Sequence, residues 1–135
     1  MNARILVSLA LVVIAGCATT AVPLDQAKPG KVAPNEWQSP TPGSGTLTIV
    51  RDTGMQGAAC TSHVLINGKP VADLRIAQTA TVYLPPGEYI AGVRNATICG
   101  GGDSSVSVTM TAGARKAYRV GISVAGDLKI EPAAL

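Results

Sequence analysis

Residues 62–74 read SHVLINGKPVADL, two apolar runs on either side of a short polar turn. Asn67-Gly68 stands between two apolar runs, and a type I′ turn needs positive φ at both of its central positions, which Asn and Gly tolerate. The stretch therefore predicts a two-residue β-hairpin that joins a strand over residues 62–66 to a strand over residues 69–74.

Outward from this hairpin, apolar and polar residues alternate in short runs rich in Val, Ile, Thr and Tyr, which strands prefer. Such alternation is typical of strands with one face on a core and the other in water. The alternating runs are residues 46–49, 105–110, 117–122 and 128–131. Turn residues separate the expected strands at Pro85-Pro86-Gly87-Glu88, Ala112-Gly113 and Ala125-Gly126-Asp127. Two further strands, residues 81–84 and 89–94, flank the first of these turns.

Eight short strands with turns at intervals of about 8–12 residues are typical of a sandwich or small barrel. We therefore expect an all-β domain over residues 45–135. The expected architecture is a small antiparallel β-sandwich of about seven or eight strands, immunoglobulin-like or transthyretin-like. No segment after the first seventeen residues has helical periodicity.

The composition excludes several other classes of protein. Apolar residues make up 47% of the 135, aromatic residues 3% and charged residues 14%, with 15 Gly and 9 Pro. A coiled coil or helical bundle would be richer in charge, and a disordered chain would be poorer in Val, Ile and Leu. The net charge is +3 and the basic residues are scattered, so we expect no nucleic-acid partner.

The N-terminus has the pattern of a secretory signal peptide. Arg4 follows the amino terminus, and residues 5–15 form an apolar run that is shorter than the roughly 20 residues of a membrane-spanning helix. Ile14-Ala15-Gly16-Cys17 follows and resembles the bacterial lipobox. The resemblance implies a signal peptide over residues 1–16, a lipid on Cys17, and a place in the bacterial envelope. Because Ala18 rather than Asp follows Cys17, the resemblance favours the outer membrane, with the domain facing the periplasm. An ordinary signal peptide cut at or after Ala18 is the alternative.

Residues 17–44 are expected to hold the lipidated Cys17 and a flexible, Pro-rich tether. Five Pro residues lie in this stretch, and Pro resists both helices and central strands. Such a segment reads as an extended spacer that lifts the domain off the membrane. Trp37 leaves two alternatives open, because an isolated Trp in a linker either stays in the spacer or docks on the domain.

Two cysteines remain when Cys17 is assigned to lipid. Cys60 and Cys99 are an even pair in an exported domain, where oxidising conditions favour a disulfide. A metal site is the competing interpretation, but the chain has one His and no suitable ligand spacing, so we expect neither metal nor cofactor. A Cys60–Cys99 bridge would fix the base of the Gly-rich loop over residues 95–103.

A second resemblance rests on the turns. Ile66-Asn67-Gly68-Lys69-Pro70-Val71, followed by Leu84-Pro85-Pro86-Gly87-Glu88-Tyr89, resembles the PEGA-type repeat of bacterial surface proteins. The similarity covers residues 62–94, and the chain departs from the pattern where the Gly-rich loop replaces a Gly-aromatic pair. The chain after residue 16 also resembles small bacterial lipoproteins that share this hairpin and a Cys-Gly-Gly-Gly segment. Neither resemblance implies an enzymatic activity.

The remaining chemistry-bearing residues do not form a catalytic pattern. His63 is the only His, no nucleophile motif accompanies it, and the carboxylates fall mostly at turns. Gly100, Gly101, Gly102 and Asp103 precede an expected strand rather than a helix, so they do not form a phosphate loop. They are either a flexible connection or a contact loop held at its base by the disulfide.

These observations favour a membrane-anchored envelope lipoprotein with a non-catalytic binding or structural role. Its partners would be the membrane, through the lipid on Cys17, and an envelope protein or peptidoglycan. One alternative is an inhibitor of a cell-wall-degrading enzyme, similar to the small lipoproteins that block lysozyme. Another is an accessory component of an envelope secretion or assembly apparatus.

Overall fold

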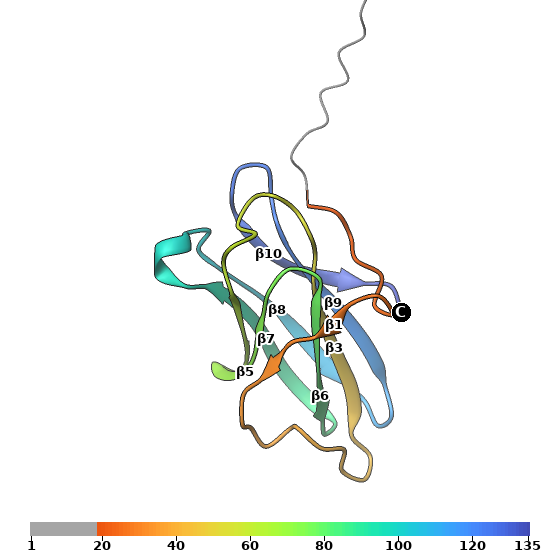
Figure 1. Ribbon diagram of the computed structural model, residues 1–135. Coiled ribbons are helices and arrows are strands. Elements are labelled where there is room, and N and C mark those ends of the chain that lie inside the picture. Colours follow the sequence, from red (N-terminus) through yellow and green to blue (C-terminus); the bar gives the residue numbers. More distant parts are fainter. Residues whose placement is uncertain (1–18) are drawn as a thin grey trace, which may run out of the picture.

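The computed structural model describes residues 19–135, and it is a sandwich of two five-stranded sheets (Figure 1). The first sheet has the order β1 (Lys28–Pro29), β6 (Gln78–Leu84), β3 (Gly45–Arg51), β9 (Arg115–Ile122), β10 (Leu128–Ala133). The second has the order β2 (Lys31–Val32), β5 (Lys69–Leu74), β4 (Ser62–Ile66), β7 (Gly87–Asn95), β8 (Asp103–Met110). The expected all-β sandwich is confirmed. Most neighbours pair antiparallel, and β3–β9 and β1–β6 pair parallel.

The alternation in the sequence corresponds to the two faces of each sheet. Leu47 and Ile49 in β3, and Val108 and Met110 in β8, lie in the core, while the intervening Thr48 and Thr109 are more exposed. The core also takes Val64 and other apolar residues from β4 to β7. Burial of these aliphatic side chains, at roughly 25 cal/mol per Å² of apolar surface, is the main force that holds the two sheets together.

The hairpin that the sequence predicts is present. Asn67 and Gly68 have φ of 50° and 78°, as a type I′ turn requires, and Ile66 pairs with Lys69. The turn also docks on β7, because the Asn67 side chain accepts a hydrogen bond from the Ile90 N–H at 2.8 Å. The turn therefore sets the register of three strands of the second sheet.

The two sheets are joined at one side, where β8 and β10 lie side by side. The Leu128 N–H donates to the Gly101 carbonyl at 2.9 Å, and the Ile130 N–H donates to Ser104 Oγ at 3.1 Å. The Gly-rich loop, which connects β7 to β8 in the second sheet, is therefore hydrogen-bonded to β10 of the first sheet.

The prediction of a flexible tether is wrong for residues 19–44, which pack along the sandwich (Figure 1). β1 pairs with β6 at one sheet edge, and β2 pairs with β5 at the edge of the other sheet. Trp37 is buried in the core, and its carbonyl accepts a hydrogen bond from Tyr83 N–H at 2.9 Å. The physical reason is that β6 and β5 each have free backbone N–H and C=O groups at a sheet edge, and the segment pairs with them. Burial of Trp37 adds an apolar contact. The Pro content of the segment gives no information about either interaction.

A single glycine allows this segment to cross from one sheet to the other. Gly30 lies between β1 and β2, and a Cβ atom there would lie 2.4 Å from the Leu74 side chain. Within residues 19–135, the only helical segment is the 3₁₀ turn η1 (Thr97–Cys99), and no helix is long and apolar enough to cross a membrane. The expected signal peptide over residues 1–16 and the lipidation site Cys17 lie outside the described residues.

Candidate functional site

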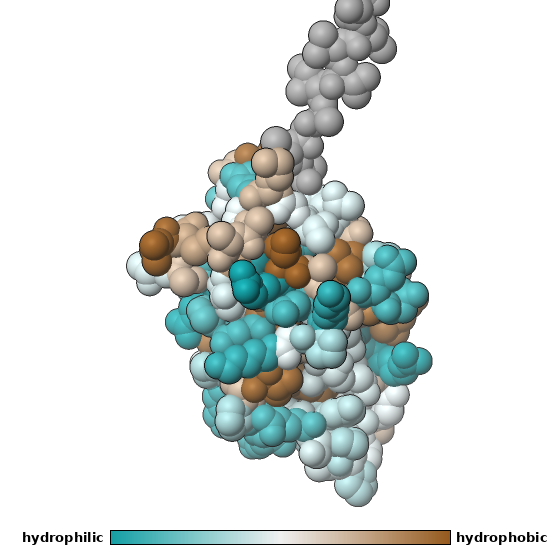
Figure 2. Space-filling view, viewed as in Figure 1, coloured by the Kyte–Doolittle hydropathy of each residue, from teal (hydrophilic) through white to brown (hydrophobic). Residues whose placement is uncertain are grey.

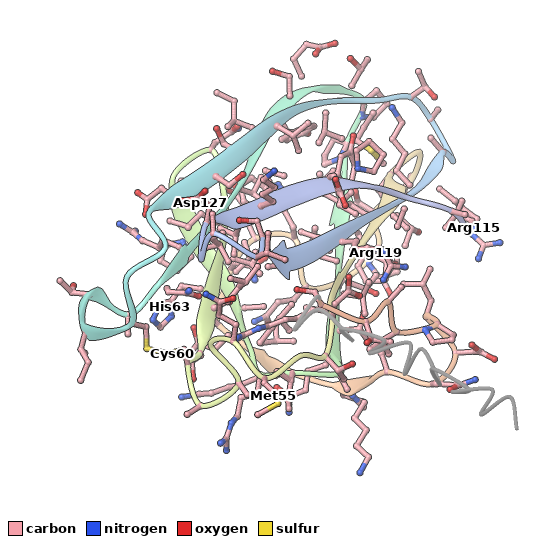
Figure 3. The ribbon with its side chains drawn as sticks, turned by 90° about the horizontal axis from the view of Figure 1, so that it is seen from above. Met55, Cys60, His63, Arg115, Arg119 and Asp127 are labelled. Atoms are coloured by element: carbon pink, nitrogen blue, oxygen red, sulfur yellow. A yellow bond between two sulfur atoms is a disulfide. The ribbon has the colours of Figure 1, made fainter. Side chains whose placement is uncertain are left out.

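Four loops gather at one end of the sandwich, at the top of Figure 1. They connect β3 to β4, β5 to β6, β7 to β8 and β9 to β10. We call this surface the loop platform and define it as residues 53–61, 75–77, 96–102 and 123–127. Figure 3 looks down onto it, with Met55 and Cys60 labelled on the first of these loops and Asp127 on the fourth.

A disulfide joins two loops of the platform, which confirms the expected Cys60–Cys99 pair. The two cysteines are 39 residues apart in sequence, with a Cα–Cα distance of 6.1 Å. Cys99 ends η1, where its N–H donates to the Ala96 carbonyl at 2.8 Å. The bridge therefore ties the two loops to each other.

Arg51 organises the longest loop of the platform from inside the protein. Its guanidinium is buried and donates to the Gly57 carbonyl at 2.7 Å, to the Leu74 carbonyl at 3.0 Å, and to the Cys60 carbonyl. Burial lowers the pKa of Arg51. Sequence analysis grouped Arg51 with the scattered basic residues. The signal that it overlooked is that Ile49 and Val50 are consecutive apolar residues, which ends the alternation of β3, and Ile49, Val50 and Arg51 are all buried.

The N-terminal end of the described chain is also held at the platform. Thr19 Oγ1 donates to the Ile122 carbonyl at 2.6 Å and accepts from the Ile122 N–H at 3.1 Å. Thr20 and Thr53 exchange backbone hydrogen bonds of 2.8 and 3.1 Å. The chain therefore joins the sandwich at the platform, at a position that sequence analysis did not identify.

A buried carboxylate reinforces this attachment. Asp52 accepts a hydrogen bond from the Val22 N–H at 3.1 Å and forms an ion pair with Arg119. Burial raises the pKa of Asp52 above its ordinary value, although the Val22 N–H and the Arg119 guanidinium both act in the opposite direction. The pair holds the first described residues against β3 and β9.

The expected contact loop lies in the platform, but its glycines are not equivalent. Gly101 has a φ of 90°, and a Cβ atom there would lie 3.1 Å from the Gly126 carbonyl oxygen. At Gly100 and Gly102 the same test finds no heavy atom within 4 Å. Asp103 begins β8 directly opposite Arg94 of β7. Gly101 is therefore required by packing, and Gly100 and Gly102 face open space.

A groove of about 400 Å³ lies on the outer face of the second sheet. It forms where Gly92 in β7 has no side chain between Leu65 and Ser105. Ile90 forms one side, and Arg94 and Asp103 lie at the end nearest the platform. The groove offers an apolar floor, hydroxyl groups and both signs of charge.

His63 lies on the same outer face and pairs with Asp73 across β4 and β5. The distance from Nδ1 to Oδ1 is 2.7 Å, and the two side chains are 38% and 35% exposed. Cys60, three residues before His63, is oxidised and has no free thiol. Within residues 19–135, no group of three or more His, Cys, Asp or Glu side chains is placed to hold a metal ion.

Comparison of the chain with models of known protein families, with curated proteins and with solved structures finds no match.

Proposed function

We propose that the protein is a lipid-anchored lipoprotein of the bacterial envelope whose β-sandwich has a non-catalytic binding or structural role. The observation that carries this proposal is Ile14-Ala15-Gly16-Cys17 directly after a short apolar run. A lipid on Cys17 would stabilise membrane attachment without a membrane-spanning helix, by about 0.8 kcal/mol per buried methylene. The outer membrane, with the domain facing the periplasm, is the proposed location.

The disulfide supports an exported protein. Cys60–Cys99 is the type of bond that persists in oxidising compartments such as the periplasm and is rare in the cytosol. A domain with 3% aromatic residues has few large side chains for its core, so a covalent link between loops is of particular value to it.

The arrangement of polar side chains supports a non-catalytic role. Arg51 is hydrogen-bonded to three backbone carbonyls, and Asp52 is occupied by Val22 and Arg119. His63 is paired with Asp73 on an open sheet face. Each of these groups holds strands or loops together, and this structural role explains why the residue is present without assigning it a role in catalysis.

The groove supports a binding role. Its lining combines Ile90 and Leu65 with Ser105, Arg94 and Asp103, which suits a segment of an envelope protein or of peptidoglycan. Inhibition of a cell-wall-degrading enzyme through the loop that carries Gly100–Gly102 remains an alternative proposal. So does an accessory role in a secretion or assembly apparatus.

Cell fractionation of two variants tests the anchor. Cys17→Ser removes the lipid acceptor, so the protein should move from the membrane to the soluble fraction and lose incorporation of labelled palmitate. Gly16→Ala is the matched control, since it keeps a small residue before the cut and should leave both properties unchanged. Retention of Cys17→Ser in the membrane, with normal processing, would contradict the proposal.

Photo-crosslinking in whole cells tests the binding role. A crosslinking residue at Ser105 in the groove should capture a discrete partner, and one at Lys129 on the first sheet should not. Both positions are exposed on strands, so neither change disturbs the core. Co-sedimentation with peptidoglycan and a lysozyme inhibition assay on the same protein distinguish the alternatives. Equal capture from both positions would count against the groove.

A further inference from the structure

The exposed apolar side chains of the domain are concentrated at one end. Within residues 19–135, seven large apolar side chains are exposed, and four of them lie in the loop platform. Each platform loop carries one: Met55 is 84% exposed, Ile76 38%, Ile98 95% and Val124 75%. Exposed aliphatic groups on one surface mark a site of contact with another apolar phase or partner.

The platform loops also carry little charge. Residues 53–61 and 96–102 contain no Asp, Glu, Lys or Arg, and the other two loops contribute one Arg75 and one Asp127. In Figure 2 the top of the molecule is mostly tan, brown and white, and most of the strongly teal surface lies below it. The opposite end carries exposed charges next to its turns, including Lys69, Glu88 and Arg115.

Contacts between the loops hold these side chains as one fixed surface. Cys60–Cys99 links the first loop to the third, and the Gly101 carbonyl accepts from Leu128 N–H beside the fourth. A Cβ atom at Gly126 would lie 3.2 Å from the Gln56 side chain, so the first and fourth loops also touch. A surface fixed in this way loses little conformational entropy when it binds.

The described chain begins beside this surface, two residues after the expected lipid attachment. Thr19 is hydrogen-bonded to Ile122 next to the platform, and Thr19, Gly54 and Ile76 line one small depression. Cys17 precedes Thr19 by two residues, and two residues span at most about 7 Å. A lipid on Cys17 therefore brings the membrane surface to the platform, whereas a free tether over residues 17–44 would have held it away.

We propose that the loop platform is a membrane-contact surface, on which the domain sits directly against the bilayer that holds its lipid. The inference rests on the proposed anchor at Cys17. Ile98 and Val124, with Met55, would enter the boundary between headgroups and acyl chains, where exposed apolar side chains are stabilised. Arg75 would meet the lipid phosphates, and the Asp127 carboxylate would remain among the headgroups in water.

This orientation changes the role of the expected contact loop. Gly100, Gly102 and Ile98 face the lipid and are withdrawn from soluble partners. The groove on the outer face of the second sheet stays accessible, with its Arg94 and Asp103 end nearest the membrane.

Depth-dependent fluorescence quenching tests the inference with the full lipidated protein in phospholipid vesicles. Ile98→Trp places an indole on the platform, and Ile90→Trp, at an exposed residue of the second sheet, is the matched control. The buried Trp37 of the unmodified protein gives the background. Spin-labelled lipids with a shallow label should remove roughly half or more of the signal added by Ile98→Trp, since the platform lies at the interface. They should leave the Ile90→Trp signal near the background, and aqueous iodide should have the opposite preference.

Two results would overturn the inference, and they are distinguishable. Protein that does not co-float with the vesicles contradicts the anchor and the inference together. Protein that co-floats, while lipid quenching of Ile98→Trp equals that of Ile90→Trp, contradicts the inference alone. In that case, protection of Ile98→Trp from iodide only at high protein concentration would assign the platform to a second copy of this chain.

Discussion

Removal of the Cys60–Cys99 disulfide should lower the stability of the domain by a large and calculable amount. The bridge closes a loop across a sequence separation of 39 residues. The chain-entropy relation for a loop of about 40 residues gives a loss of stability of roughly 4 kcal/mol at 25 °C. The loss arises because the unfolded chain gains conformational entropy when the bridge is absent. Because the entropy of unfolding is roughly 2.1 cal/mol/K per residue, this loss lowers the melting temperature of a domain of this size by roughly 15 °C.

The variant for this test is Cys60→Ser with Cys99→Ser, since either single change leaves a free thiol. Thermal unfolding followed by circular dichroism, without reductant, compares it with the native protein. Reductant should lower the melting temperature of the native protein towards that of the variant and should leave the variant unchanged. A melting temperature of the variant within a few degrees of the native value would show that the disulfide contributes little to the stability of the domain. The loops would then be held by their hydrogen bonds alone.

Three further substitutions test the interior of the domain by chemical denaturation. Arg51→Met should cost about 3 kcal/mol or more, because it leaves three carbonyls without their donor, and an unchanged midpoint would contradict the role of Arg51. Trp37→Ala should cost about 3–5 kcal/mol because this indole is a core residue; a cost near zero would restore the free tether. Asp52 has a raised pKa in the folded state, so its contribution to stability is greatest below the ordinary carboxyl pKa and falls as the pH rises through the raised value. The stability of the native protein relative to Asp52→Asn should therefore fall as the pH rises above the ordinary carboxyl pKa, and a rise in stability there would contradict the raised pKa.

The strands and their turns could be predicted because their signals are local. Asn67-Gly68 specifies its own turn type, and alternation specifies which face of β8 or β9 meets the core. The disulfide could be predicted from cysteine count and export. None of these inferences required knowledge of which strands lie in which sheet.

The packing of residues 19–44 and the burial of Arg51 could not be predicted, because both depend on partners distant in sequence. β1 and β2 exist only because β6 and β5 present free edges to them. Burying the charged Arg51 side chain costs free energy, and the hydrogen bonds that it donates to carbonyls of the loop folded over it offset that cost. The loop platform could not be predicted for the same reason, since whole strands separate its four loops along the chain.

Intact-mass spectrometry of the mature protein from cell membranes tests the central claim most directly. The mature chain should begin at Cys17 and carry the added mass of a diacylglyceryl group, usually with a further acyl chain on the new amino terminus. An unmodified chain that begins at Ala18 or later would contradict the lipid anchor, and with it the placement of the domain on the membrane.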